Sequence, residues 1–308
     1  MRTRKIGSLE VSVVGLGCNN FGGRLDADKS ADVVYAALDN GITFFDTADI
    51  YGGTKSEEFL GEALGKRRDD VVLATKFGMQ VDKERRGAKP DYVHRALEDS
   101  LRRLQTDRVD LYILHAPDPD TPIADTLEAL DACVTAGKVR EIGCSNFSAA
   151  QMREAAAAVR DGAARFVCVQ NEYSLVQREP EREVLAECRR LAMAFVPYFP
   201  LASGLLTGKY KRGEAPPAGT RLSGMPAERI AALDEKLVVV ERLTANARQS
   251  GHTILELAVC WLLSHDEVAS VIAGATSRAQ VESNAAAGEW ILGEAERREV
   301  DALATPVA

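Results

Sequence analysis

The stretch VVLATK, from Val71 to Lys76, is a run of apolar and small residues with no ionisable side chain before its final lysine. Such a run is typical of a strand buried on both faces, as in a parallel sheet covered by helices. Further runs rich in valine, isoleucine and phenylalanine recur along the chain. The eight predicted strands are Val11–Gly15, Thr43–Asp46, Val71–Lys76, Val109–His115, Glu141–Ser145, Phe166–Gln170, Phe195–Phe199 and Ser270–Gly274.

Segments with helical spacing of apolar residues separate these runs. Prolines or Ser148 precede several of them, and glycines follow the ends of others, as helix caps require. The predicted helices are Asp28–Asn40, Tyr92–Leu104, Ile123–Ala136, Ala149–Arg160 and Glu181–Ala192. Alternation of strands and helices on this scale indicates either a barrel or a large doubly wound sheet.

We predict a (β/α)8 TIM barrel in which residues 1–308 form a single domain. The strands number eight, and polar residues occur at the C-terminal ends of strands throughout the series. In a barrel these ends converge on one mouth, whereas in an open sheet most of them lie too far apart to cooperate. Lys5–Val11 is predicted to form a short N-terminal β-hairpin. Leu201–Pro226 is the longest irregular stretch, and loops of that length are usually functional.

The composition restricts the classes of partner. The net charge of −8 disfavours broad nucleic-acid binding, although it leaves room for a local basic pocket. No apolar run approaches the roughly 20 residues that span a bilayer, and Met1–Glu10 lacks the apolar core of a signal peptide. The six cysteines form no CxxC pair and are interpreted as reduced, mostly buried thiols. We therefore expect a cytoplasmic protein with no nucleic-acid partner, no membrane partner and no metal.

Four ionisable residues lie at or just after predicted strand ends: Asp46, Tyr51, Lys76 and His115. Each alone has an ordinary structural explanation. Together they indicate chemistry, because a lysine buried at a barrel mouth needs a carboxylate, and Asp46 lies on the neighbouring strand. This pair is expected to lower the pKa of the Tyr51 phenol from about 10. Tyr51 could then donate a proton to a carbonyl oxygen during hydride transfer, while neutral His115 orients that carbonyl.

In order, spacing and strand placement these residues resemble the catalytic tetrad of the aldo-keto reductases. The similarity is to the long-loop branch, which includes bacterial aldo/keto reductases and potassium-channel β subunits, and it extends over nearly the whole chain. Other matching segments are Gly15–Gly17, Gly41–Ala48, Gly137–Gly143, Ser145–Phe147, Gln170–Tyr173, Pro200–Tyr210 and Gly274–Asn284. The resemblance implies an oxidoreductase acting on CH-OH donors with NADP as acceptor. In the reductive direction it would convert aldehydes or ketones to alcohols with NADPH, and Tyr51 would be the general acid.

The resemblance also implies how the chain holds NADPH without a Rossmann domain. The residues expected to bind the nicotinamide are Ser145, Asn146, Gln170 and Tyr198, with Tyr198 stacked on the ring. Those expected along the pyrophosphate are Pro200, Leu201 and Ser203, and those expected to clamp the adenosine-side phosphates are Lys209 and Arg221. The remaining cofactor positions are Cys18, Asn19, Asp46, Phe199, Gly274, Thr276, Gln280 and Asn284.

Two of these positions depart from one branch of the family. Gly274 and Gln280 stand where that branch has basic residues, so recognition of a 2′-phosphate would depend on Lys209 and Arg221, with Arg278 as a further candidate.

The substrate pocket is expected to be formed by Phe21, Tyr51, Phe77 and His115, with the stretch Met79–Lys89 beside them. Sugars, aromatic aldehydes, pyridoxal and ketones all remain candidate substrates. The expected partner is a small carbonyl compound, and the expected assembly is a monomer or a small homo-oligomer.

Two other functions compete with a reductase. A regulatory protein could use the same barrel and cofactor, as the potassium-channel β subunits do, although this chain has no long N-terminal extension and keeps His115. A metal-dependent hydrolase would need clustered ligands, whereas the chain has four histidines and no HxH motif. Turnover of a simple aldehyde separates the first alternative from a reductase, and a metal assay separates the second.

Overall fold

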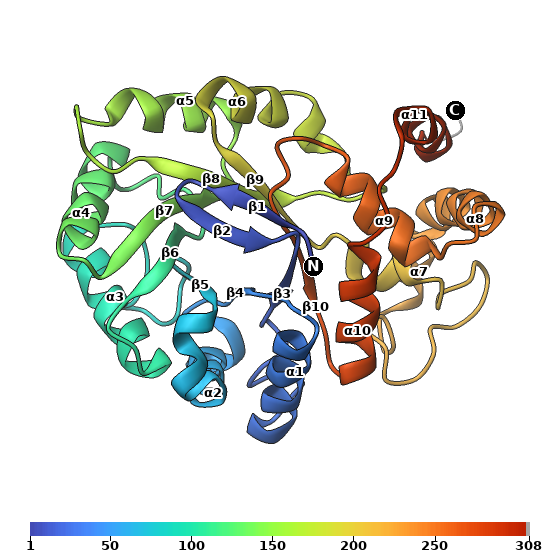
Figure 1. Cartoon of the computed structure of the whole chain (residues 1–308), viewed down its shortest axis with the longest axis horizontal. Coiled ribbons are helices and arrows are strands. Elements are labelled where there is room, and N and C mark those ends of the chain that lie inside the picture. The colour runs from blue at the N-terminus through green and yellow to red at the C-terminus, as the bar shows by residue number, and fades with distance from the viewer. Residues whose placement is uncertain (306–308) are drawn as a thin grey trace.

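The computed structural model describes residues 1–305; residues 306–308, which the domain prediction includes, lie outside the described part. Eight parallel strands form a barrel in the order β10-β3-β4-β5-β6-β7-β8-β9 (Figure 1). A parallel bridge between Phe195 of β9 and Val268, just before β10, joins the two ends of this sheet. The predicted (β/α)8 architecture is thus confirmed. The barrel strands are β3 (Val14–Gly17), β4 (Phe44–Asp46), β5 (Val72–Phe77), β6 (Val109–Leu114), β7 (Val139–Ser145), β8 (Phe166–Glu172), β9 (Ala194–Tyr198) and β10 (Val271–Gly274).

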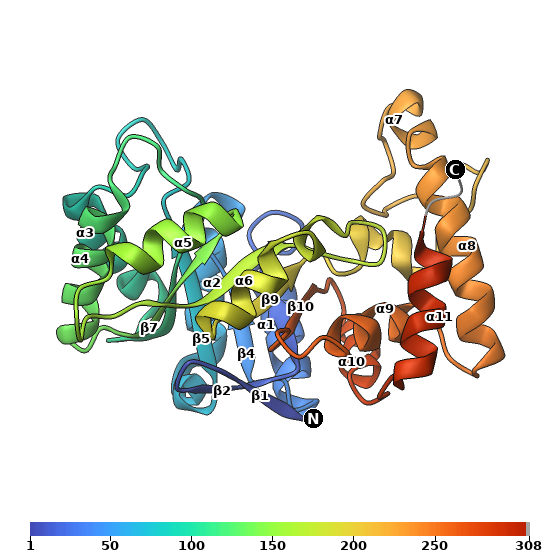
Figure 2. The same cartoon turned by 90° about the horizontal axis from the view of Figure 1, so that it is seen from above.

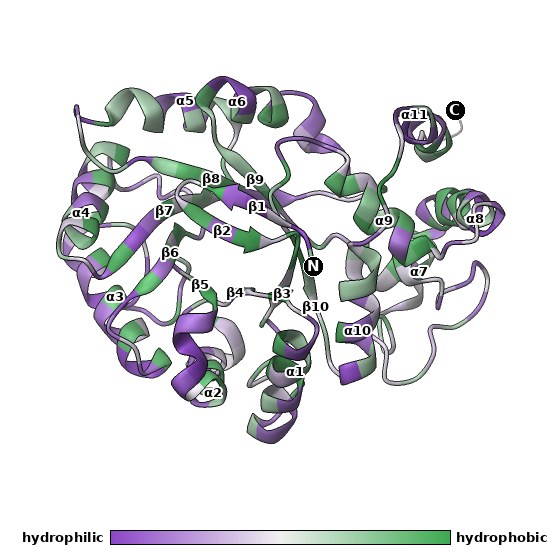
Figure 3. Ribbon diagram, in the orientation of Figure 1, coloured by the Kyte–Doolittle hydropathy of each residue, from purple (hydrophilic) through white to green (hydrophobic). Residues whose placement is uncertain are grey.

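Helices form an outer ring around the barrel (Figure 1). Apolar and polar residues segregate on many of them, as Figure 3 shows, because one side covers the strands and the other meets water. The predicted cap Ser148 starts α5 through a reciprocal pair of hydrogen bonds with Gln151. The helices are α1 (Ala27–Asp39), α2 (Lys55–Leu64), α3 (Pro90–Leu104), α4 (Ile123–Thr135), α5 (Ala149–Ala158), α6 (Val184–Leu191), α7 (Ala227–Ala231), α8 (Asp234–Gln249), α9 (Ile254–Leu263), α10 (Arg278–Ala287) and α11 (Glu294–Ala304).

An antiparallel hairpin covers the N-terminal end of the barrel. Its strands are β1 (Thr3–Ile6) and β2 (Leu9–Ser12). The hairpin side chains Ile6, Leu9 and Val11 are fully buried in the same cluster as the residues that fill the barrel interior. In Figure 2 the hairpin lies along the lower edge of the molecule, and the segment that carries α7 rises at the opposite edge. The hairpin therefore closes one end of the barrel and leaves the C-terminal strand ends for chemistry.

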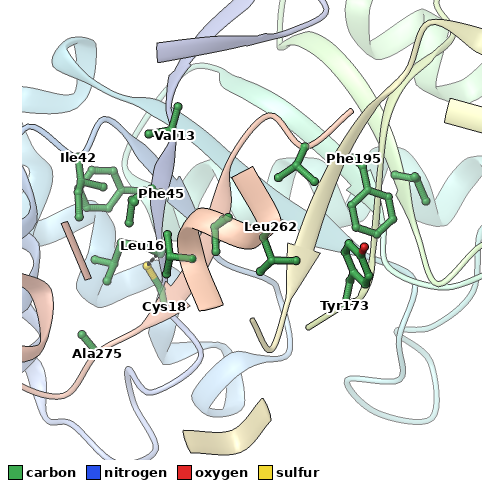
Figure 4. Close-up of a cluster of buried hydrophobic side chains, with 14 of the residues drawn as sticks. Val13, Leu16, Cys18, Ile42, Phe45, Tyr173, Phe195, Leu262 and Ala275 are labelled. Atoms are coloured by element: carbon green, nitrogen blue, oxygen red, sulfur yellow. Dashed lines mark hydrogen bonds between the residues drawn. The ribbon is translucent and has the colours of Figure 1, made fainter. Parts of the chain in front are cut away.

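A second, larger core fills the space between the strands and the helices. Neighbouring residues of one strand contribute to different cores, because successive side chains of a strand point to opposite faces. Phe44 packs inside the barrel, whereas Phe45 joins the outer core. Figure 4 shows part of this outer core, with Phe45, Leu16 and Leu262 among its buried side chains.

Most predicted boundaries lie within two residues of the observed ones, but two predicted starts are wrong by three residues. The first barrel strand begins at Val14 and not at Val11, because Val11 belongs to the hairpin strand β2. The hairpin side chains that plug the barrel are as apolar as barrel residues, so the sequence shows no break there. Helix α6 begins at Val184 and not at Glu181, because Glu181 is held in a preceding 3-10 turn by hydrogen bonds from Tyr173 and Arg178.

The cysteine prediction is confirmed: all six are free and buried. Within residues 1–305, no helix has the length and apolar character needed to cross a membrane.

Candidate active site

The strand ends opposite the hairpin open onto a cavity of about 740 Å³. This volume is typical of a binding site for a sizeable organic ligand. The four predicted catalytic residues all line the cavity. Asp46 ends β4, Lys76 lies near the end of β5, and His115 follows β6, while Tyr51 begins the 3-10 helix Tyr51–Thr54. The barrel therefore brings together side chains that are up to 69 positions apart, from Asp46 to His115.

Lys76 forms the centre of the cluster. The residue is 1% exposed, and its ammonium donates to Asp46 Oδ2 at 2.5 Å and to the Thr47 carbonyl at 2.9 Å. A third, longer hydrogen bond reaches the Tyr51 hydroxyl at 3.4 Å. Burial by itself lowers the pKa of Lys76, but Asp46 and Tyr51 outweigh this effect and hold the pKa above its usual value. The ammonium is therefore charged at neutral pH.

Tyr51 is positioned by the sharp turn that follows it. Gly52 has φ of +58°, and a Cβ at this position would lie 2.2 Å from the carbonyl oxygen of Phe21. Only glycine fits there. The Tyr51 ring then meets His115 edge to face, with ring centres 5.8 Å apart, and the Lys76 ammonium lies 5.1 Å from the Tyr51 ring centre.

The expected direction of the Tyr51 pKa shift is wrong for this structure. Burial raises the pKa of the phenol, and the opposing effect of the Lys76 ammonium does not fully offset it. The reason is that the cavity wall removes water from the site, which disfavours the phenolate. Tyr51 consequently keeps its proton at neutral pH, which is the state that a proton donor needs.

His115 is neutral in this environment. It is 6% exposed, and burial together with the nearby Lys76 ammonium lowers its pKa to about 3. Its Nδ1 atom is buried without a hydrogen-bond partner in the described structure. Its backbone N–H donates to the carbonyl of Phe77 at 2.8 Å, which ties the end of β6 to the end of β5. The imidazole can thus form hydrogen bonds while carrying no charge.

The residues expected to bind a nicotinamide also line the cavity. Gln170 donates to Asp46 Oδ1 at 2.7 Å, so both oxygens of this carboxylate are engaged. Asn146 donates to the carbonyl of His115 at 2.9 Å and accepts from the Tyr198 hydroxyl at 2.7 Å. The bond of Gln170 spans the barrel mouth from β8 to β4, and the bonds of Asn146 join the ends of β6, β7 and β9 and fix the Tyr198 ring at the cavity wall. Contact of Ser145, Asn146, Gln170 and Tyr198 with a carboxamide stays a prediction.

The cavity also contains positively charged side chains besides Lys76. Lys209 and Arg221 line it, together with Arg24 from the loop between β3 and α1. None of these three cations has an ion-pair partner among the described residues. Since Asp46 and Lys76 neutralise each other, the charged residues of the lining sum to three positive charges (Arg24, Lys209 and Arg221). An anionic ligand would compensate them.

The Arg221 side chain also contacts an aromatic ring of the cavity wall. Its guanidinium lies 4.9 Å from the ring centre of Phe199. Burial, and then the nearby Arg24, lowers the pKa of Arg221. Arg24 itself donates to the carbonyl of Gly219 at 2.9 Å and so connects the two loops that flank the cavity. Within the long loop, Lys211 and Arg212 instead pair with Glu214 and Glu241.

Most of the remaining predicted cofactor residues also line the cavity. They are Asn19, Phe199, Pro200, Leu201, Ser203, Gly274, Thr276, Gln280 and Asn284. Arg278 is not among the lining residues, and it forms an ion pair with Asp39 at 2.9 Å. Cys18 is also absent from the lining, since it is fully buried in the outer core.

The two phenylalanines expected in the substrate pocket are placed differently. Phe21 and Phe77 are fully buried in the outer core and do not line the cavity. Phe77 follows Lys76 in β5, so its side chain points to the opposite face, where it stacks on Tyr112 at 4.6 Å. The alternation of strand side chains could have excluded Phe77 from the sequence alone. Met79, two residues further along, does line the cavity.

Ile50 and Arg24 line the cavity but were not predicted from the sequence. Ile50 precedes Tyr51 and adds an apolar surface beside it. Arg24 is an exposed cation in a glycine-containing loop, and no pattern in the sequence distinguishes it from other surface arginines. Among residues 1–305, no group of three or more His, Cys, Asp or Glu side chains is placed to hold a metal ion.

Comparisons with known proteins agree with this geometry. The sequence model of the Aldo/keto reductase family matches residues 13–305. The NADP(+) aldo-keto reductase yakc of Schizosaccharomyces pombe is 35% identical over 97% of this chain and 90% of its own length. A probable voltage-gated potassium channel subunit beta of Arabidopsis thaliana is 34% identical over 90% of this chain and 87% of its own length. The holo form of the aldo-keto reductase AKR11C1 from Bacillus halodurans superposes with a TM-score of 0.84 at 33% identity, covering 99% of this chain and 97% of that one.

Proposed function

The chain belongs to the aldo/keto reductase family, and from this premise we propose that it reduces aldehydes or ketones to alcohols with NADPH, using Tyr51 as the general acid. The observation that carries the proposal is the cluster of Asp46, Tyr51, Lys76 and His115 at one wall of the cavity. A bound nicotinamide nucleotide would supply the hydride for the carbonyl carbon. The protein residues would manage the charge that develops on the carbonyl oxygen.

Tyr51 is suited to donate the proton. Its raised pKa keeps the hydroxyl protonated at neutral pH. Its oxygen accepts a hydrogen bond from Lys76, so its own proton is free for the substrate oxygen. After the transfer, the ammonium of Lys76 would stabilise the phenolate, because the two groups lie 3.4 Å apart and the ammonium is buried. General acid catalysis of this kind contributes roughly 10²- to 10⁴-fold in rate.

His115 and Asp46 support this proton transfer in different ways. With a pKa of about 3, His115 cannot be the proton source at neutral pH, so we assign it the role of orienting the carbonyl through a neutral hydrogen bond. Asp46 holds the ammonium of Lys76 in place, and Gln170 in turn fixes the carboxylate of Asp46.

The charge of the proposed cofactor matches the cations that line the cavity. Phosphate oxygens would compensate Arg24, Lys209 and Arg221, which the protein leaves without ion pairs in its described part. Because NADPH carries an additional 2′-phosphate, these cations should bind NADPH more tightly than NADH. The printed name of the Schizosaccharomyces pombe relative, which includes NADP(+), points the same way.

The six free thiols fit a reducing compartment, and we accordingly propose a cytoplasmic location.

The proposed function is tested by mixing the purified protein with NADPH and a panel of aldehydes and ketones. Oxidation of NADPH that depends on both protein and carbonyl compound is the expected result. If the protein binds NADPH tightly but oxidises it with no member of a broad panel, the reductase proposal is wrong. That outcome would favour the regulatory alternative, in which the barrel binds a cofactor and serves a partner protein.

A further inference from the structure

The loop from Gly78 to Lys89, between β5 and α3, forms part of the cavity wall beside the catalytic residues. Its contribution is Met79, three positions after Lys76. The loop leaves and returns at nearly the same point, because the backbone N–H of Gly87 donates to the carbonyl of Gly78 at 2.8 Å. The position of this narrow neck therefore determines where Met79 stands relative to Tyr51 and His115.

Asp118 holds the neck of this loop from the next βα connection. Its Oδ2 atom accepts from the backbone N–H of Ala88 at 2.7 Å and from the Thr121 hydroxyl at 2.8 Å. Its Oδ1 atom accepts from the backbone N–H of Asp120 at 3.0 Å. The carbonyl of Ala88 is held as well, since the buried Thr126 hydroxyl donates to it at 3.0 Å. Both backbone polar groups of Ala88 are thus bound by residues that follow β6.

The backbone of Gly87 packs directly against the contact of Asp118 with Ala88, which we call the clasp. Gly87 has φ of +81°, and a Cβ at this position would lie 2.8 Å from Asp118 Oδ2. Burial raises the pKa of Asp118, but its three hydrogen-bond donors outweigh this and keep the pKa below its usual value. The carboxylate therefore remains ionised and retains all its accepting capacity.

The clasp is linked directly to the catalytic group. Asp118 lies three positions after His115, whose backbone already binds the carbonyl of Phe77 at the start of the same loop. Movement at Asp118 would therefore change the distance between Met79 and the carbonyl site. We propose that Asp118 is a positioning residue that fixes the loop 78–89 as a wall of the substrate site and thereby sets which carbonyl compounds fit. This proposal rests on the proposed reductase function.

The test compares Asp118→Ala and Asp118→Asn with the control Asp120→Asn, whose side chain is exposed and has no hydrogen bond in the structure. Trypsin can cleave the loop at Lys83, Arg85 and Arg86. Cleavage at these sites, measured by mass spectrometry, should become roughly ten- to hundredfold faster in both Asp118 variants. This factor corresponds to the loss of hydrogen bonds to a charged group, which opens the loop more often. The control should be cleaved at the wild-type rate.

A kinetic comparison tests the consequence for substrate choice. With a series of aldehydes of increasing bulk, both Asp118 variants should differ least from wild type in kcat/KM for the smallest member. Their preference, measured as the ratio of kcat/KM values, should shift about tenfold toward the bulky members, as expected when one wall of a pocket loosens. The dissociation constant of NADPH should not change, because neither Asp118 nor its hydrogen-bond partners Ala88, Asp120 and Thr121 line the cavity.

The two measurements separate the possible failures. Loop cleavage at the wild-type rate in both Asp118 variants would show that Asp118 does not hold the loop 78–89 in place. Faster cleavage with unchanged substrate preference would overturn its role in substrate choice. If wild-type protein reduces no aldehyde at all, the proposed function fails, and the same cleavage rates still decide whether Asp118 holds the loop.

Discussion

The ammonium of Lys76 lies 3.4 Å from the hydroxyl oxygen of Tyr51, and it is the donor in that contact. This direction matters, because a phenol whose oxygen accepts from a cation keeps its own proton available for another acceptor. The same cation is balanced by Asp46 at 2.5 Å, so the site contains a charged donor without a net charge of its own. The pKa of Tyr51 and the stability of the site both depend on this arrangement.

The buried ion pair should matter for folding as well as for rate. In Lys76→Met or Asp46→Asn one charge of the pair stays buried without its partner, and breaking such a pair typically costs ~3–5 kcal/mol. Chemical denaturation of both variants should show a loss of this order in the free energy of unfolding. The exposed pair Arg278–Asp39 provides the matched control, since Asp39→Asn should cost less than ~1 kcal/mol. Equal, small losses in all three variants would show that Lys76 and Asp46 do not form a buried pair.

The pKa of His115 makes a prediction about stability at acidic pH. The unfolded chain protonates this histidine below about pH 6.5, whereas the folded protein does so only near pH 3. Stability is therefore lost as the pH falls through this window, by roughly 1.4 kcal/mol per pH unit from this one group. Between pH 7 and pH 5, His115→Gln should lose about 2 kcal/mol less than wild type. Equal losses in His115→Gln and in wild type would contradict this prediction.

The ionisation of Asp49 should make the folded protein less stable as the pH rises, which is the opposite of the effect of His115. It is 2% exposed, its Oδ1 atom has no partner in the described structure, and burial followed by the neighbouring Glu57 raises its pKa to about 7. Between about pH 4 and pH 7 the unfolded chain releases this proton while the folded protein keeps it, so rising pH destabilises the fold. Asp49→Asn should remove this slope and be more stable than wild type at pH 8. Urea denaturation at pH 5 and pH 8 measures the effect, and a variant less stable than wild type at pH 8 would contradict it.

Preference for NADPH should depend on the cations that line the cavity. Each charge-assisted hydrogen bond to a 2′-phosphate contributes roughly 1.5–3 kcal/mol, so Arg221→Ala should weaken NADPH binding by about tenfold or more. NADH binding should change much less. Lys211→Ala is the control from the same loop, because Lys211 pairs with Glu214 and does not line the cavity. Equal dissociation constants for NADPH and NADH in wild-type protein would refute the preference, and a preference that persists in Arg221→Ala would shift the assignment to Lys209 or Arg24.

Much of the fold was predictable because the strands of a closed barrel leave a strong pattern. Strands buried on both faces are nearly continuous apolar runs, and polar residues gather where they end. The start of β3 was not predictable, since Val11 packs into the barrel interior from the hairpin and carries the same apolar signal as a barrel residue. Helix α6 was predicted to begin too early because hydrogen bonds from Tyr173 and Arg178 to the Glu181 side chain hold the preceding turn, and the spacing of apolar residues does not reveal them.

The candidate site was predictable to a different extent. The tetrad could be located because the ends of parallel strands converge, so residues distant in the sequence were expected to meet. The direction of the Tyr51 pKa shift was not predictable. It depends on whether burial, which raises the pKa, outweighs the Lys76 ammonium, which lowers it. The contacts of Arg24 and Asp118 were not predictable either. Arg24 contacts Gly219 and Asp118 contacts Ala88 across loops whose conformations the sequence pattern does not reveal.

The most direct test of the account is a comparison of wild-type protein with Tyr51→Phe, which removes the hydroxyl and keeps the ring. Two quantities are needed on the same preparations: kcat/KM for an aldehyde that the wild type reduces, and the dissociation constant of NADPH. We predict that kcat/KM falls by roughly 10²- to 10⁴-fold, the contribution of a general acid, while the dissociation constant is unchanged. Reduction of the aldehyde by Tyr51→Phe at the wild-type rate would contradict the assignment of Tyr51 as the proton donor.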